Sequence, residues 1–430
     1  MKKLIALIML LAVPANSEML AEYGSFAKPN ATTGHQSVAV GFLPKVVILF
    51  GNYNTTDGSN VGAREFMGAA VSSSKQFVIA SASGDTLDPT RQDKRWSNAL
   101  VITQITEPTP TVNAEAVFVG MDSSSFTINW TTCDASQRII NYLILGGDDL
   151  TNADVGSFTA PTSAGNLAVT GVGFQPDALI IVDNTATTTP TGAGNAASSA
   201  FNIGFVVGTA KQCSRSTFRQ DNQATSNTWG YQRTDSCQNT VSGAGAVVRT
   251  ATIGSMGTDG FTLAFNPAPA NAVYINYIAL KGGSYDTGAF DQAATTGNQS
   301  VATGFQPTGV ILQSAGYATS ASVSSISRIS LGVGISSTQR GTIWTGDLDA
   351  QAAGVSDQVL DRTKCLTFYT EGTPTLDADM DFVSNDANGF TVNNTTADGT
   401  QREILYFAFG SGGAGPTPST NNSIFFGGGL

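Results

Sequence analysis

Histidine is nearly missing from this sequence: His35 is the single histidine among 430 residues. Histidine-rich metal sites are therefore excluded, and a Ser-His-Asp triad would have to use this one residue. Charge is scarce as well, since Asp, Glu, Lys and Arg make up 12% of the chain, against about 25% in a typical soluble domain. The 21 basic and 32 acidic residues give a net charge of −11, which would repel nucleic-acid phosphates. We expect no nucleic-acid partner.

Long apolar runs are missing too. The most apolar run, residues 4–13, has ten residues, too few to cross a bilayer, so we expect no stable membrane span. Two lysines precede it and Ala15-Asn16-Ser17 follows, so residues 1–21 read as a signal-like segment cleaved after Ser17. A buried N-terminal strand or helix and a start at Met19 are the alternatives. Residues 413–430 form a Gly/Pro-rich tail with an apolar end, which either docks on a neighbour or frays.

What the sequence has is an internal repeat. Gly-Phe-x-Pro turns at 41–44, 173–176 and 304–307 are each followed by an apolar run. Farther on, Phe-Thr-(Ile/Leu/Val) occurs at 126–128, 261–263 and 390–392, and a tyrosine follows each of these phenylalanines by 16 residues (Tyr142, Tyr277 and Tyr406). The phenylalanines of the two blocks are 84, 87 and 85 residues apart. Two blocks at nearly constant separation predict three tandem copies of one domain.

The repeats set the expected domain boundaries. The copies cover residues 22–148, 154–283 and 284–412. At about 130 residues, each copy is large enough to bury a core of its own and to fold independently. Short glycine-containing joints at 146–148 and 282–284 predict a compact row of neighbouring domains.

The periodicity of apolar residues is two, as in β-strands. Residues 376–382 alternate strictly between apolar and acidic side chains, which is typical of a half-buried strand. Phe118, Ile253 and Phe382 align between the copies, and we expect them in the core. Short β-rich runs between Gly and Pro turns indicate sandwiches. The predicted fold is all-β, with three tandem homologous antiparallel β-sandwich domains of the jelly-roll or lectin-like kind.

Candidate residues for chemistry are few. His35 is replaced by Asn166 and Asn298 in the other copies, which indicates a polar turn residue and not a catalytic base. Asp377, Asp379 and Asp381 share one strand face and could hold a Ca²⁺ ion with the help of a loop. The middle copy has Thr250 and Thr252 at the places of the last two, so a solvated strand face is favoured. We assign no catalytic residue, metal or cofactor.

For the cysteines and tryptophans, structural roles are favoured over functional ones. The four cysteines form no C-x-x-C pair, which excludes a zinc ribbon. Cys237 and Cys365 align with Val101, so we expect a small buried site there. Four unpaired thiols are the default, and a Cys213–Cys237 disulfide is the alternative in an exported protein. Trp96, Trp229 and Trp344 lie in the variable middle of each copy. They are candidate sugar-stacking platforms, although core or interface packing is favoured.

These motifs resemble a known kind of domain. Each copy opens with a Gly-Ser-Phe-like strand (24–26, 156–158 and 288–290) and continues with the Gly-Phe-x-Pro turn; the middle copy closes with Tyr-Ile-Ala-Leu-Lys-Gly-Gly at 277–283. This order resembles repeat domains in structural proteins of tailed bacteriophages. It is also similar to the H-type lectin domain, a six-stranded sandwich that trimerises and binds sugars. The copies here are longer by a polar insert, and no sugar-contacting residue of that family can be placed on them.

The resemblance implies a non-enzymatic structural protein on a phage virion surface, such as a fibre, spike or decoration subunit. It would form a homo-oligomer, contact other virion or surface proteins, and could attach to cell-surface glycans. The alternative is a secreted bacterial adhesin or extracellular filament subunit with carbohydrate-binding repeats, which the signal-like segment favours. An enzyme is not expected, because no pair of carboxylates at a suitable spacing is visible.

Overall fold

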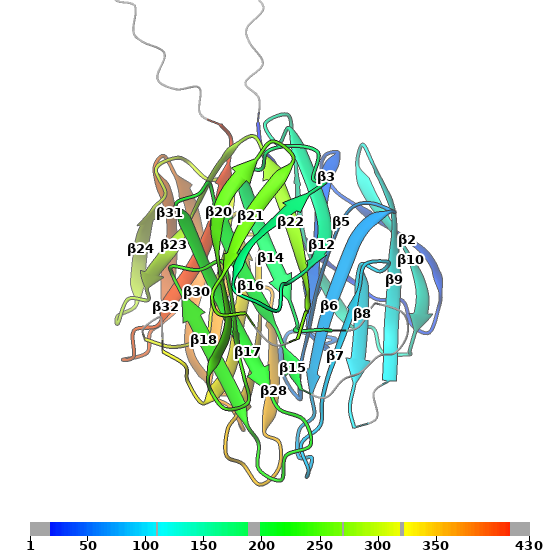
Figure 1. Ribbon diagram of the computed structural model, residues 1–430, viewed down its shortest axis with the longest axis vertical. Coiled ribbons are helices and arrows are strands. Elements are labelled where there is room, and N and C mark those ends of the chain that lie inside the picture. The colour runs from blue at the N-terminus through cyan, green and yellow to red at the C-terminus, as the bar shows by residue number, and fades with distance from the viewer. Residues whose placement is uncertain (1–17, 109–110, 188–197, 269–270, 319–321, 413–430) are drawn as a thin grey trace, which may run out of the picture.

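The computed structural model describes residues 18–108, 111–187, 198–268, 271–318 and 322–412 (Figure 1). These residues form strands and loops without a helix, from β1 (Leu20–Ala27) to β32 (Glu403–Gly410). The sheets are antiparallel and pair face to face into sandwich units. The all-β sandwich prediction is therefore confirmed. The signal-like residues 1–17 and the tail 413–430 lie outside the described residues.

Sandwich 1 is built from an inner sheet of six strands and an outer sheet of four. In pairing order, the inner sheet contains β1, β11 (Ile139–Gly146), β3 (Pro44–Gly51), β5 (Ala63–Ser72), β6 (Lys75–Ser83) and β7 (Gln92–Ser97). The outer sheet contains β2 (Gly34–Ala39), β10 (Ser125–Cys133), β9 (Thr111–Asp122) and β8 (Ile102–Thr106).

Sandwich 2 has the same order of connection. Its inner sheet contains β12 (Asn152–Thr159), β22 (Tyr274–Lys281), β14 (Ala178–Asp183), β16 (Asn202–Val207) and β17 (Lys211–Arg219), with β15 (Ser199–Ala200) and β18 (Thr228–Arg233) both paired to β17. The outer sheet contains β13 (Gly165–Thr170), β21 (Gly260–Phe265), β20 (Val247–Gly257) and β19 (Gln238–Val241).

Sandwich 3 repeats the pattern once more and borrows a strand. Its inner sheet contains β23 (Ser284–Asp291), β32, β25 (Gly309–Ser314), β26 (Ile326–Gly334), β27 (Arg340–Leu348), β28 (Ser356–Asp361) and β4 (Gly58–Val61). The outer sheet contains β24 (Gly297–Ala302), β31 (Gly389–Thr396), β30 (Leu376–Asp386) and β29 (Leu366–Tyr369). Because β4 comes from the chain of sandwich 1, it ties the first and last units together.

Each sandwich has its own core between its two sheets. The predicted core residues Phe118, Ile253 and Phe382 are at most 8% exposed and belong to the cores of sandwiches 1, 2 and 3 respectively. Strands of the inner sheets are buried on both faces, as in β11 and β32, where every residue is buried. Alternation disappears in such strands because both faces are covered.

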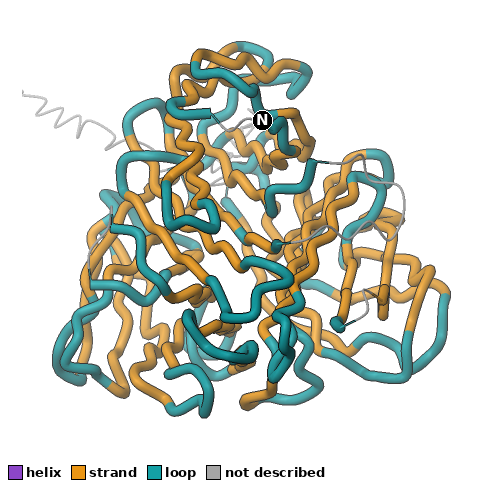
Figure 2. The backbone as a smooth tube through the Cα atoms, turned by 60° about the horizontal axis from the view of Figure 1, so that its bottom comes forward, coloured by secondary structure: helices purple, strands orange, loops and turns teal. Residues whose placement is uncertain are grey.

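The second face of each inner sheet packs into a central core shared by all three sandwiches. This core includes Phe77 of sandwich 1, Ile180 and Phe205 of sandwich 2, and Leu331 and Phe407 of sandwich 3. Figure 2 shows the strands gathered in three groups around a common centre. The prediction of a row is therefore wrong: the units form a ring, because each inner sheet carries a second apolar face that only the other two can cover.

The ring closes through the same contact at every seam. Strand β12 packs on β5 and β6, strand β23 packs on β16 and β17, and strand β1 packs on β27. The first strand of each sandwich thus covers the hairpin of its neighbour. A head-to-tail contact of this kind generates a closed ring when its rotation returns to the start, and here three units complete the turn.

Polar side chains repeat at the seams. A tyrosine on the last strand of each unit donates to an acid on its first strand, Tyr142 to Glu22, Tyr277 to Asp154 and Tyr406 to Asp286. Two of these acids also pair with a lysine of the preceding unit, Asp154 with Lys75 and Asp286 with Lys211. At the third seam Gln339 stands in place of the lysine and accepts from the Tyr23 N–H at 3.2 Å.

Separating one sandwich from the ring should expose its inner apolar face. We expect a chain of residues 152–283 alone to aggregate, whereas the whole protein should unfold in one calorimetric transition. Differential scanning calorimetry and static light scattering measure these outcomes. Three separate transitions, or a soluble monomeric fragment with a cooperative melt, would contradict the shared core.

A single methyl group on β16 should be costly. A Cβ at Gly204 would overlap the backbone carbonyl of Cys237, so Gly204→Ala should lower the free energy of unfolding by about 1–3 kcal/mol through overpacking. Gly120→Ala on β9 is the matched control, because nothing lies within 4 Å of its Cβ position. Equal stability of the two variants in urea denaturation would show that the close strand approach is not real.

Candidate functional site

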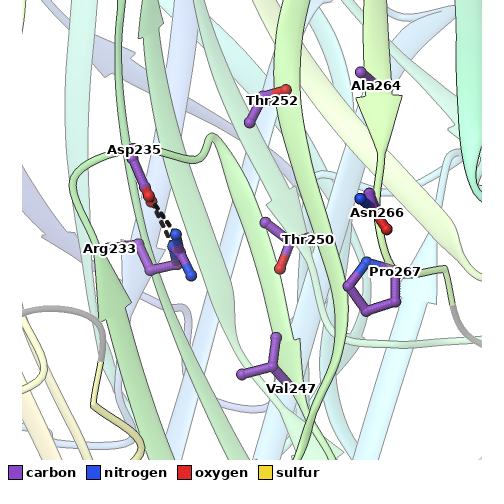
Figure 3. Close-up of a pocket in the computed structure, with 8 residues that line it drawn as sticks. All are labelled: Arg233, Asp235, Val247, Thr250, Thr252, Ala264, Asn266 and Pro267. Atoms are coloured by element: carbon purple, nitrogen blue, oxygen red, sulfur yellow. Dashed lines mark hydrogen bonds and ion pairs between the residues drawn. The ribbon is translucent and has the colours of Figure 1, made fainter.

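A groove lies on the outward face of the outer sheet of sandwich 2 (Figure 3). It has a volume of about 580 Å³. Thr250 and Thr252 of β20 form its floor, pointing away from the core that their neighbours Ala251 and Ile253 enter. The remaining lining residues are Arg233, Asp235, Val247, Ala264, Asn266 and Pro267.

The groove has a polar wall made by an ion pair. Arg233, at the end of β18, pairs with Asp235 through two hydrogen bonds and also donates to the Tyr231 hydroxyl at 2.8 Å. The Arg233 guanidinium lowers the pKa of the Asp235 carboxyl. The carboxylate therefore stays ionised near neutral pH and the pair carries no net charge. The opposite wall is Asn266 and Pro267, which follow β21 (Figure 3).

The same strand face is filled by ion pairs in the other two sandwiches. Glu115 of sandwich 1 stands where Thr250 stands and pairs with Arg95. In sandwich 3 the two positions are Asp379 and Asp381, and Lys364 lies 3.1 Å and 3.6 Å from their carboxylates. Sandwich 2 has threonines instead, so this face is open there.

The three aspartates proposed as a calcium site are each held by a cation. Asp377 accepts from Arg402 at 3.0 Å, Asp379 pairs with Lys364, and Asp381 lies 3.2 Å from Arg340. They share one face of β30, as expected from alternation. Within the described residues, no group of three or more His, Cys, Asp or Glu side chains is placed to hold a metal ion.

The three candidate tryptophans have different environments. Trp96 is 6% exposed, stacks on Tyr274 of sandwich 2 with ring centroids 4.1 Å apart, and donates to Asn276 at 2.7 Å. Trp344 is fully buried. Trp229 is half-buried and donates to the Asn227 side chain at 2.6 Å. Trp229 is therefore the most exposed of the three, and it lies on the same strand, β18, as Arg233 of the groove.

The remaining candidates have structural roles. His35, Asn166 and Asn298 are exposed on the edge strands of the outer sheets. All four cysteines are free thiols, so Cys213 and Cys237 do not form a disulfide. Cys237 and Cys365 are fully buried, as is Val101. Each of these three lies against a glycine of the inner sheet, Gly204, Gly332 and Gly68 in turn.

At one end of the ring, three loops join in a cycle that the sequence did not predict. The clasp loops, residues 84–91, 220–227 and 349–355, follow β6, β17 and β27 and lie at the bottom of Figure 1. Each donates one backbone N–H to the next: Asn222 to Thr90 (2.8 Å), Ala350 to Ser226 (2.8 Å) and Thr86 to Gly354 (2.7 Å). The return bonds run from Thr90 to Gln223, Ser226 to Gln351 and Gly354 to Leu87.

The clasp loops use unusual backbone and one repeated acid. Thr86, Asn222 and Ala350 have φ of 56°, 55° and 58°, a left-handed conformation that costs about 1 kcal/mol or more for a residue with a Cβ. Two residues after Ser83, Arg219 and Asp347, an aspartate (Asp85, Asp221 or Asp349) accepts from a backbone N–H of a neighbouring sandwich. This repeated Asp is a signal of the clasp in the sequence.

Behind the clasp, buried charges from all three sandwiches meet. Arg219 of sandwich 2 lies 2.6 Å from Glu65 of sandwich 1 and 2.5 Å from Asp347 of sandwich 3. The Arg219 and Glu65 side chains are 0% exposed and that of Asp347 is 3% exposed. Burial raises the pKa of both carboxyls, and Arg219 acts in the opposite direction. Because these side chains are buried, their contacts join the three sandwiches to one another.

The two ends of the described chain meet at the opposite end of the ring, at the top of Figure 1. The Met19 N–H donates to the Ser411 hydroxyl at 2.9 Å, and the Gly412 N–H donates to Asp149 at 2.7 Å. The ring therefore has one pole that holds both ends of the described chain and one pole closed by the clasp loops.

No protein-family model matches the chain, and neither the curated proteins nor the solved structures yield a match. The described part of the chain also contains no helix long and apolar enough to cross a bilayer.

Removing the shared arginine should destabilise the ring strongly. Arg219→Met leaves two buried carboxylates unpaired, so we expect a loss of about 3–5 kcal/mol at pH 8. Burial raises both carboxyl pKa values and Arg219 lowers them. Removing Arg219 therefore raises both pKa values further, so the folded variant takes up protons at a higher pH than the unsubstituted protein does. The deficit should therefore be smaller at pH 5.

The control for this variant is Arg362→Met, which breaks a half-exposed pair with Asp57 and should cost about 1 kcal/mol or less. Urea denaturation at both pH values measures all three proteins. A pH-independent deficit in Arg219→Met, or one no larger than that of the control, would contradict the assigned role.

Proposed function

We propose that this chain is a non-enzymatic structural protein of a phage virion surface, a fibre, spike or decoration subunit. It works by assembly and by attachment to host-surface glycans. The observation that carries the proposal is that the two ends of the ring differ in structure. Both ends of the described chain lie at one pole, where the ring can be anchored, and the clasp loops and outer sheets are left free to face outward.

We further infer that the three sandwiches are copies of one ancestral unit of the lectin-like kind. They share strand order, and a glycine opposite each repeated tyrosine leaves space for its ring (Gly24, Gly156 and Gly288). Three sandwiches around a central core reproduce, within one polypeptide, the arrangement expected of a trimeric sandwich protein. This supports the resemblance to H-type lectin domains, which trimerise.

Contacts with other copies or other virion proteins would use surfaces outside the ring seams, because the seams are already occupied. The edge strands β2, β13 and β24 of the outer sheets are suited to this, since each has a neighbour on one side only and most of its residues are partly or fully exposed. Unpaired strand edges are templates for pairing with another chain.

Size-exclusion chromatography with light scattering tests the assembly. We expect a mass of at least twice that of the single chain. Electron micrographs of the native material should show regular fibres, spikes or lattices. A monomer at all concentrations, with no particle bound by antibodies to the chain, would contradict the proposal.

The adhesin alternative is supported by the signal-like residues 1–21. Mass spectrometry of the natural protein separates the two: an N-terminus at Glu18 supports secretion, and one at Met1 or Met19 supports the virion role.

A further inference from the structure

We propose that the groove of sandwich 2 binds one neutral sugar residue of a surface glycan. This inference rests on the attachment role proposed above and gives it a site and a ligand class. It also predicts one site in each chain and not three, because the equivalent faces of sandwiches 1 and 3 are filled by ion pairs.

The lining of the groove has no net charge, which favours a neutral ligand over an ionic one. Arg233 and Asp235 neutralise each other through a two-bond pair, and the other six lining residues are uncharged. An anionic sugar would find no free cation in the lining and would approach a chain of net charge −11. A cationic ligand would have to compete with Arg233 for its carboxylate. A neutral ligand meets neither cost.

The hydrogen-bonding groups of the groove match those of a sugar. Thr250, Thr252 and Asn266 line the floor and one wall of the groove, and within the described residues their side chains make no hydrogen bond. Hydroxyl and amide groups both donate and accept, as sugar hydroxyls do. The Asp235 carboxylate has lone pairs left to accept from a further hydroxyl, since each oxygen receives one bond from Arg233.

Apolar atoms lie between these polar groups. Val247, Ala264 and the Pro267 ring contribute carbon surface to the lining (Figure 3), against which the C–H face of a pyranose can pack. The volume of about 580 Å³ is within the range of small-molecule sites. The groove is open and not enclosed, so a residue within a longer glycan chain can enter as well as a terminal one.

Saturation-transfer NMR on the full-length protein tests the proposal with named probes. These are neutral oligosaccharides containing glucose, galactose, mannose or N-acetylglucosamine, compared with sialylated and sulfated ones. We expect at least one neutral probe to bind and the anionic probes to bind at least tenfold more weakly. No binding by any neutral probe, or tighter binding of the anionic ones, overturns the inference.

Variants locate the binding. The double variant Thr250→Asp/Thr252→Asp copies the acids of sandwich 3 into the groove and should weaken binding at least tenfold, and Asn266→Ala should weaken it several-fold. The matched control is Ser255→Asp, on the same strand, exposed and outside the lining. Unfolding temperatures verify that each variant is folded. Retained binding in both groove variants, or equal loss in the control, overturns the assignment.

The two proposals fail separately. Particles that contain the chain but bind no neutral sugar overturn the ligand inference alone. Sugar binding by a chain that never assembles into particles overturns the virion proposal and leaves the groove assignment in place.

Discussion

Apolar contact among the three inner sheets is the constraint on which the rest of the structure depends. Each inner sheet has one face on its own outer sheet and the other on a core shared with two neighbours. Burial of apolar surface is non-directional, so it holds the units together without fixing their rotation. The seam tyrosines, the lysine–aspartate pairs and the clasp loops supply direction, because hydrogen bonds and ion pairs require particular partners.

The ring is symmetric in its backbone and asymmetric in its chemistry. The clasp repeats its hydrogen bonds three times, yet the residues that meet behind it are Ser83, Arg219 and Asp347, one kind from each unit. Gln339 replaces the seam lysine once. The groove of sandwich 2 has Thr250 in its floor, where sandwiches 1 and 3 have the paired acids Glu115 and Asp379. The backbone bonds of the clasp tolerate this variation because they do not depend on side-chain identity, whereas a site on an outer face does depend on it.

The repeats made the strands and the core predictable. Phe118, Ile253 and Phe382 were placed correctly because each lies in an alternating strand at a fixed distance from a repeated phenylalanine. The ring was not predicted. Runs such as Val46–Leu49 and Ala178–Ile181 are apolar on both faces, which indicates double coverage without saying what covers it. The groove was not predicted either, because Thr250 of the outer sheet and Arg233 of the inner sheet line one groove only when the two sheets pack together.

Because one backbone runs through all three sandwiches, dilution of the protein cannot separate them. A trimer of separate subunits dissociates when its concentration falls below its dissociation constant. Here, the partners of each sandwich are tethered to it by joints of a few residues, so they remain at an effective concentration on the order of millimolar. The ring should therefore keep its fold as a single molecule at any protein concentration.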